Sequence, residues 1–262
     1  MVKKSIEDKA VIVNPEEEYA YGYIIKALAS GLYHNKFDVI REYVLNAYNA
    51  VVKWEDLNKV ISNGIKIIIK KPSISICDYG TGMNEETINA YRKVGFSKKK
   101  AGEVVGFRGI GKLSGISVAK KLIITTSPEG IEEKYTLEFD ADSMIKELDD
   151  LKKNQKNIPL NELIEEYTAI KTEKEKKNEH YTSIQLYEIK ENSKDLLNKN
   201  KLKDYISKNA PVEFDPNSAY KTKIENGIKK FVKSFRSVKI SVNGVKTYKP
   251  LLENVMKPGE II

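Results

Sequence analysis

Two glycine-rich segments constrain this chain more than any other feature of its sequence. In the first, Asp78 directly follows an apolar stretch, and Gly80 and Gly82 come two and four positions later. The second reads Gly106-Phe107-Arg108-Gly109-Ile110-Gly111-Lys112. Glycine also marks ordinary turns and helix ends, so either segment alone is a weak signal. Together, and preceded by a helix with a polar stripe, the two segments predict a nucleotide pocket.

The polar stripe belongs to a segment with helical periodicity. Its apolar residues recur at helical spacing and predict a helix over residues 36–54 with this core face: Phe37, Ile40, Val44, Leu45, Tyr48, Val51 and Val52. Glu42, Asn46 and Asn49 are spaced i, i+4 and i+7, which puts them on one stripe. An asparagine carbonyl oxygen can bind Mg²⁺, which commonly binds through phosphates and keeps several waters. Glu42 is placed to polarise a water that attacks a terminal phosphate.

Asp78 is the candidate contact for adenine. Residues 65–70 and 74–77 read as two antiparallel strands of a hairpin, so Asp78 stands where a strand ends. A buried carboxylate there can accept a hydrogen bond from the exocyclic amine of adenine, and it disfavours a purine with a carbonyl at that position. Gly80 and Gly82 would let the backbone turn sharply beside the base. An ordinary aspartate–glycine turn is the alternative reading.

The second glycine segment is suited to phosphate contact. It leads into a predicted helix from Gly111 to Lys120, whose free N–H groups and positive dipole end can hold phosphate oxygens. The segment lacks the Gly-x-x-x-x-Gly-Lys-[Ser/Thr] form of a P-loop, and no strand precedes it as in a dinucleotide fingerprint. Those two nucleotide-binding folds are therefore disfavoured.

The remaining pattern predicts further helices and strands on both sides of this segment. Helices are expected over residues 15–30, 84–94, 194–208 and 219–235, and strands over 122–126, 135–139, 182–189, 238–242 and 245–248. Asn84 is the expected N-cap of the second of these helices. Residues 141–180 are rich in lysine, glutamate, aspartate and asparagine, which indicates solvated helices or an insertion.

Composition bounds the class of protein. The chain has 262 residues, and 40% of them are hydrophobic, enough for a normal buried core. No apolar run approaches the roughly 20 residues of a membrane span, and the N-terminus lacks the apolar core of a secretory signal, so we expect a cytoplasmic protein without a membrane partner. Cys77 is the only cysteine, and the two histidines lack partners at metal-ligand spacing. The net charge of +8 is compatible with a nucleic-acid partner, although lysine runs are commonly solvated surface.

Four motifs, in this order, resemble those of the GHKL superfamily, which comprises gyrase B, the heat-shock-protein-90 chaperones, histidine kinases and MutL-type repair proteins. They are Glu42-x-x-x-Asn46, Asp78-x-Gly80-x-Gly82-Met83, the run from Gly106 to Gly111, and Thr182. The resemblance covers roughly residues 15–190. It implies an α/β two-layer sandwich of the Bergerat type, with a mixed, largely antiparallel sheet covered by helices on one face. ATP would bind between the helices, under a mobile lid at about residues 94–108.

The resemblance also implies roles for individual residues. Glu42 would be the general base, Asn46 the Mg²⁺ ligand, Asp78 the adenine contact, and Thr182 a support for Asp78 and its water. The remaining ATP contacts would be Asn49, Gly80, Gly82, Met83, Gly106, Phe107, Arg108, Gly109, Ile110, Gly111 and Lys112. A glutamate at position 42 is similar to the ATPase branches and unlike histidine kinases. Asn49 stands where many relatives have aspartate, and Tyr181 where glycine is common, so the chain departs from the usual pattern at both positions.

These features predict an ATP-gated switch that hydrolyses ATP slowly and dimerises in a longer protein. We assign residues 1–192 to the ATP-binding domain, with a charged insertion at about 141–180, and residues 193–262 to an extension that would begin a transducer-like domain. A DNA-linked or defence role, an HSP90-like chaperone role and a nucleotide-binding regulator without turnover all remain open, because the ATPase module fits each of them. A histidine-kinase role would require a dimerisation helix pair before the pocket.

Overall fold

The computed structural model describes residues 35–92, 111–154, 158–232 and 235–250. The helix expected over residues 15–30, the expected lid and the glycine-segment residues 106–110 lie outside this part of the chain. Within it, no helix combines the length and the apolar character needed to cross a bilayer.

Eight strands form one sheet in the order β5-β4-β3-β6-β2-β1-β7-β8. The strands are β1 (Ile65–Lys70), β2 (Ser73–Asp78), β3 (Ala119–Ser127), β4 (Glu133–Asp140), β5 (Thr168–Lys174), β6 (Tyr181–Ile189), β7 (Ile240–Val242) and β8 (Val245–Thr247). β1 and β7 pair in parallel, and the other six neighbouring pairs are antiparallel. The prediction of a mixed, largely antiparallel sheet is confirmed.

In the described part of the chain, helices and two 3-10 segments precede and connect these strands. The α-helices are α2 (Phe37–Asn58), α3 (Glu85–Tyr91), α4 (Ala141–Lys153), α5 (Leu160–Glu166), α6 (Lys199–Asn209) and α7 (Lys221–Phe231), and the 3-10 helices are η2 (Gly111–Ser117) and η3 (Glu191–Leu197). Asn84 caps α3 as predicted, because its side-chain oxygen accepts a hydrogen bond from the N–H of Thr87. Asn198 caps α6 in the same way, so the helix expected over residues 194–208 is divided into η3 and α6.

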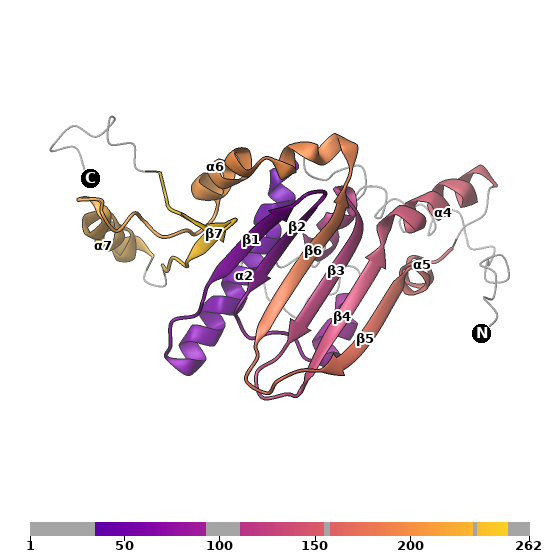
Figure 1. Ribbon diagram of the computed structural model, residues 1–262, viewed down its shortest axis with the longest axis horizontal. Helices are drawn as coiled ribbons and strands as arrows, with labels where there is room; N and C mark the ends of the chain where they lie inside the picture. Colours follow the sequence, from indigo (N-terminus) through magenta and orange to yellow (C-terminus); the bar gives the residue numbers. More distant parts are fainter. Residues whose placement is uncertain (1–34, 93–110, 155–157, 233–234, 251–262) are drawn as a thin grey trace.

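The core lies between the sheet and α2, which runs along one face of the sheet behind β1 and β2 (Figure 1). On β1, Ile65 and Ile67 are buried while Lys66 between them is exposed, as expected where only one face of a sheet is covered. The buried side chains of α2 are Val39, Ile40, Tyr43, Val44, Ala47, Val51 and Trp54. Three of the seven predicted core residues of this helix, Ile40, Val44 and Val51, are among them, and Phe37, Tyr48 and Val52 pack partly buried against the same core.

One expectation about local structure is wrong, and a second is incomplete. The helix predicted from Gly111 to Lys120 is the 3-10 helix η2, which ends at Ser117, and Lys120 already belongs to β3. Glycine and serine are poor helix formers, and the β-branched residues that follow favour a strand that pairs with β4 and β6. The charged region 141–180 contains the expected helices, but it also contains β5, which forms the edge of the sheet beside β4.

The C-terminal part of the chain contributes to the same sheet. β7 pairs with β1 through Ile65 opposite Ile240 and Ile67 opposite Val242, and β8 pairs with β7. Ile240 and Val242 are buried in the core cluster that also contains residues of α2. A separate C-terminal unit beginning at residue 193 stays a prediction, and β7 ties at least this strand to the N-terminal sheet.

Candidate functional site

Helix α2 contacts both glycine-rich segments. A Cβ atom at Gly111 would collide with the carboxylate of Glu42, and a Cβ atom at Gly80 would collide with the backbone of Ala50. Positions 42 and 50 are eight residues apart, which is about 12 Å along the axis at the helical rise of 1.5 Å per residue. The half-buried Asn46 and Asn49 lie between them. Gly80, Gly111 and the polar stripe of α2 therefore lie along one helix, and their role in holding a nucleotide stays a prediction.

Asp78 is a buried carboxylic acid at the end of β2, with 4% of its surface exposed. Its Oδ1 accepts a hydrogen bond from the N–H of Gly80 at 3.0 Å. Burial raises the pKa of Asp78 to about 7, and the hydrogen bond from Gly80 partly opposes that rise. A carboxyl group held in such surroundings is a candidate for ligand contact, because its second oxygen can accept a hydrogen bond from a bound amine.

Two threonines support the turn that follows Asp78. Thr182 of β6 lies opposite Asp78 in the strand register, and Thr126 of β3 lies opposite Thr182 on the other side. The hydroxyl of Thr126 donates to the carbonyl oxygen of Tyr181 at 2.9 Å, accepts from the N–H of Met83 at 2.8 Å, and lies 3.0 Å from the hydroxyl of Thr182. Since a hydroxyl has one hydrogen, Thr182 donates in that last bond. Thr126 thus ties Met83 to β6.

Position 82 requires a glycine for two reasons, its backbone conformation and the lack of space for a side chain. Its φ is +62°, in the left-handed region that favours glycine. A Cβ atom there would collide with the carbonyl group of Ser127 and come within 2.8 Å of Cα of Pro128. The turn from Asp78 to Gly82 is therefore packed between α2 on one side and the β3–β4 connection on the other.

The start of η2 is held by Tyr43 of α2. The Tyr43 hydroxyl accepts a hydrogen bond from the N–H of Gly115 at 2.7 Å and donates to the carbonyl oxygen of Lys112 at 3.2 Å. The ammonium group of Lys112 donates to the carbonyl oxygen of Ala90 in α3 at 3.1 Å, and burial lowers the pKa of Lys112 to about 8. The predicted contact of Lys112 with a phosphate stays a prediction.

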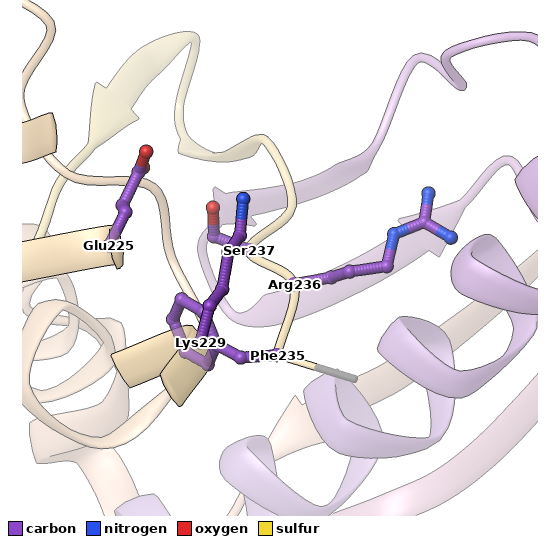
Figure 2. Close-up of a pocket in the computed structure, with 5 residues that line it drawn as sticks. All are labelled: Glu225, Lys229, Phe235, Arg236 and Ser237. Atoms are coloured by element: carbon purple, nitrogen blue, oxygen red, sulfur yellow. The ribbon is translucent and has the colours of Figure 1, made fainter. Parts of the chain in front are cut away.

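A separate hollow lies near α7. It has a volume of about 190 Å³ and is lined by Glu225, Lys229, Phe235, Arg236 and Ser237 (Figure 2). Small-molecule sites commonly have about 300–1,000 Å³. The guanidinium group of Arg236 points away from the hollow and forms ion pairs with Glu55 and Asp56. This hollow contains none of the motif residues, and we assign it no ligand.

Two residues of the site were missed by sequence reasoning. Tyr43 lies three residues after Ile40, so the helical period of the apolar residues contained a signal for it. Thr126 gave no such signal, because only the placement of β3 next to β6 brings it to Thr182. Of the predicted contacts, Glu42, Asn46, Asn49, Asp78, Gly80, Gly82, Met83, Gly111, Lys112 and Thr182 belong to the described residues, and Gly106, Phe107, Arg108, Gly109 and Ile110 do not.

The described residues fit ATP and Mg²⁺ by their chemistry. A buried acceptor at Asp78 suits an exocyclic amine. Gly80 and Gly111 pack so closely against Ala50 and Glu42 of α2 that a Cβ atom at either glycine would fill the space between them. The amide oxygen of Asn46 is a hard ligand of the kind that Mg²⁺ accepts beside phosphates and water. Glu42 lies directly against Gly111, where the second glycine segment begins its 3-10 turn.

Comparison with known proteins gives the same assignment. A family model described as "Histidine kinase-, DNA gyrase B-, and HSP90-like ATPase" matches residues 34–182. The chaperone protein HtpG of Rickettsia typhi is 30% identical to this chain over 143 residues, which cover 46% of this chain and 23% of the relative. HtpG of Wolinella succinogenes is 27% identical over 135 residues, covering 43% of this chain and 22% of the relative.

The chain spans less than a quarter of the length of these curated relatives. The family match, however, covers more than half of the chain, and it includes α2, the turn after Asp78, and Thr182. The eight-stranded sheet with α2 on one face agrees with the Bergerat fold that the motifs implied. On these grounds the chain belongs to the histidine kinase-, DNA gyrase B- and HSP90-like ATPase family.

Proposed function

We propose that this domain binds Mg²⁺-ATP and hydrolyses it slowly. The adenine would lie at the Asp78–Gly82 turn, with its amine donating to Asp78. The phosphates would lie toward Gly111, some two turns of α2 away. The observation that supports this most directly is the contact of one helix, α2, with both glycine segments, at Ala50 and at Glu42.

Glu42 would orient the attacking water and take up its proton. Its carboxylate lies against Gly111, at the end of the site assigned to the phosphates. Asn46, one helical turn further along, would hold the metal ion together with the phosphates. Mg²⁺ would neutralise charge on the phosphate oxygens. The protein groups would position the phosphates and the attacking water and would partly exclude other water.

For the longer protein we propose an ATP-gated conformational switch with an HSP90-like chaperone role. The relatives reported above are named chaperones, and this favours the chaperone hypothesis over a DNA-linked or defence role. Dimerisation on ATP binding is part of the same proposal. The nucleic-acid partner expected from the net charge stays a prediction without support from these relatives.

The first experiment is a calorimetric titration of the protein with Mg²⁺ and a non-hydrolysable ATP analogue, together with an assay of phosphate release. Glu42→Ala should bind the analogue within about threefold of the wild type and lose turnover by about 100-fold or more, because general-base catalysis commonly contributes a factor of that size. Asp78→Asn should lose binding. An asparagine replaces one of the two acceptor oxygens by an NH2 donor, so if its oxygen accepts from Gly80, its NH2 group faces the amine of adenine, which is also a donor.

Glu132→Ala is the matched control, because Glu132 is an exposed acidic residue between β3 and β4. It should leave both binding and turnover unchanged. Full turnover by Glu42→Ala would show that Glu42 is not the base. Equal affinity of the wild type for ATP and GTP analogues would contradict the role of Asp78 as the adenine contact.

A further inference from the structure

The turn from Asp78 to Gly82 is enclosed by residues that the four motifs do not include. Trp54, near the C-terminal end of α2, stacks on the ring of His180, with ring centroids 4.3 Å apart and planes inclined by 9°. Nδ1 of His180 lies 2.9 Å from the carbonyl oxygen of Gly80. Because a carbonyl oxygen only accepts, Nδ1 carries the hydrogen in this bond. The histidine ring therefore bridges α2 and the glycine turn.

Trp54 also reaches the segment on the other side of the turn. Its Nε1 donates a hydrogen bond to Oε2 of Glu129 at 2.8 Å, and only 9% of its surface is exposed. Glu129 follows Ser127 and Pro128, whose backbone lies against Gly82. One indole ring thus connects the residue before β6 with the β3–β4 connection, and the glycine turn lies between these two segments.

Gly80 is consequently held on three sides. Its N–H donates to Asp78, its carbonyl oxygen accepts from His180, and its α-carbon lies against Ala50. The carbonyl group belongs to the peptide unit after Gly80 and the N–H group to the unit before it, so the bond from His180 restrains the backbone of Gly80 on the side opposite the N–H that contacts Asp78. The hydrogen bond from His180 therefore acts on Asp78 through Gly80.

We propose that His180 and Trp54 form a clasp that positions the Asp78–Gly82 turn for an adenine nucleotide. The proposal rests on the proposed function, since it assigns the turn to the adenine. His180 is a positioning residue in this scheme, because it acts through Gly80. Its ring stacks on Trp54, and its Nδ1–H group donates the hydrogen bond to the carbonyl oxygen of Gly80.

Two substitutions separate these two contributions. His180→Phe keeps an aromatic ring for Trp54 and removes the donor, whereas His180→Asn places an amide donor near the position of Nδ1 and removes the ring. The variants of the 262-residue chain would be titrated with a non-hydrolysable ATP analogue in the presence of Mg²⁺. Hydrogen exchange of residues 78–83 would be followed without nucleotide. Trp54 is the only tryptophan of the chain, so its emission reports whether the stack survives.

We expect His180→Phe to weaken binding about tenfold, which corresponds to the loss of about 1.4 kcal/mol, the size of one hydrogen bond. The N–H of Gly80 should exchange faster in this variant. His180→Asn should restore most of the affinity. Tyr187→Phe, a change at an exposed aromatic residue of the same strand β6, is the matched control and should behave as the wild type.

Wild-type affinity of His180→Phe would overturn the proposal, whether or not exchange at Gly80 becomes faster. Equal weakening by both His180 variants would also overturn it, because the effect would then belong to the ring and not to the hydrogen bond. If the wild type itself fails to bind the analogue, the proposed function fails. Unchanged exchange at Gly80 in His180→Phe would then refute the clasp on its own, and faster exchange would support it.

Discussion

At the scale of single residues, burial of the ionised Asp78 carboxyl group lowers the stability of the folded protein. Its carboxyl group is buried at the end of β2, and burial raises its pKa from the ordinary value of 3.8 to about 7. Ionisation of this group is therefore easier in the unfolded chain than in the folded one. A carboxylic acid retained under this penalty is typical of functional sites, where local rules of burial are broken for binding or catalysis.

The sign of this effect predicts that Asp78→Asn stabilises the protein at high pH. Below pH 3.8 both states hold the proton and burial of the acid has no ionisation cost, whereas above pH 7 the folded state bears the full cost, about 4 kcal/mol for a shift of this size. Asparagine does not ionise. The free energy of unfolding of Asp78→Asn should exceed that of the wild type by about 2–4 kcal/mol at pH 8 and by less than about 1 kcal/mol at pH 4.

Urea denaturation of both proteins at the two pH values measures this difference. Glu132→Gln, a change at an exposed acid, should show no such pH-dependent gain. A stability difference for Asp78→Asn that does not grow with pH would mean that Asp78 titrates near its ordinary pKa.

At the scale of elements, α2 packs with one face and presents the site with another. Its buried residues and its polar stripe both follow the helical period, so the sequence indicated the two faces before any contact was known. The contacts are set by packing against other elements. η2 approaches α2 so closely that Gly111 touches Glu42, and Tyr43 bonds the backbone of η2 one residue further along.

This packing predicts that Gly111→Ala impairs hydrolysis more than binding. The new methyl group would occupy the space of the Glu42 carboxylate and push it from its place, while the Asp78–Gly82 turn at the other end of α2 would be unaffected. We expect turnover to fall about 10-fold or more, since general-base catalysis depends on hydrogen-bond reach, with nucleotide affinity within about threefold.

Gly227→Ala is the matched control, because a Cβ atom at that position in α7 would meet no other part of the described structure within 4 Å. Phosphate release and calorimetric titration of the two variants test the prediction. Normal turnover of Gly111→Ala would mean that Glu42 tolerates displacement, and would count against its role as the base.

At the scale of the whole molecule, distant parts of the chain share one sheet and one core. β6 lies between β2 and β3, and β7, from the predicted C-terminal extension, lies beside β1. Val242 of β7 is fully buried in the core cluster. Arg236, just before β7, pairs with Glu55 of α2, which in turn accepts a hydrogen bond from the N–H of Ser62.

We therefore expect Val242→Ala to destabilise the domain as a single unit. Loss of two buried methyl groups costs about 2 kcal/mol, and the unfolding transition should shift as a whole. Val245→Ala is the matched control, because 41% of the Val245 surface is exposed. Calorimetry that shows a separate low-temperature transition affected by Val242→Ala alone would instead indicate an independent unit after residue 193.

Part of the site could be predicted because its signals are local. The cap at Asn84, the hairpin of β1 and β2 and the stripe of Glu42, Asn46 and Asn49 depend on residues close in sequence. The 3-10 form of η2 and the edge strand β5 were missed. Pairing with β4 decided the outcome for β5, and the start of η2 is held by the hydrogen bonds of Tyr43 with Lys112 and Gly115.

The sequence by itself determined the family, the order of the motifs and the polar face of α2, because spacing along a helix or around a turn follows from backbone geometry alone. Only the tertiary structure decided which strands become neighbours. That choice places Thr126 beside Thr182 and brings His180 between Trp54 and Gly80. Such contacts join residues far apart in the chain, and they form only when the burial of apolar side chains has brought the strands and α2 together.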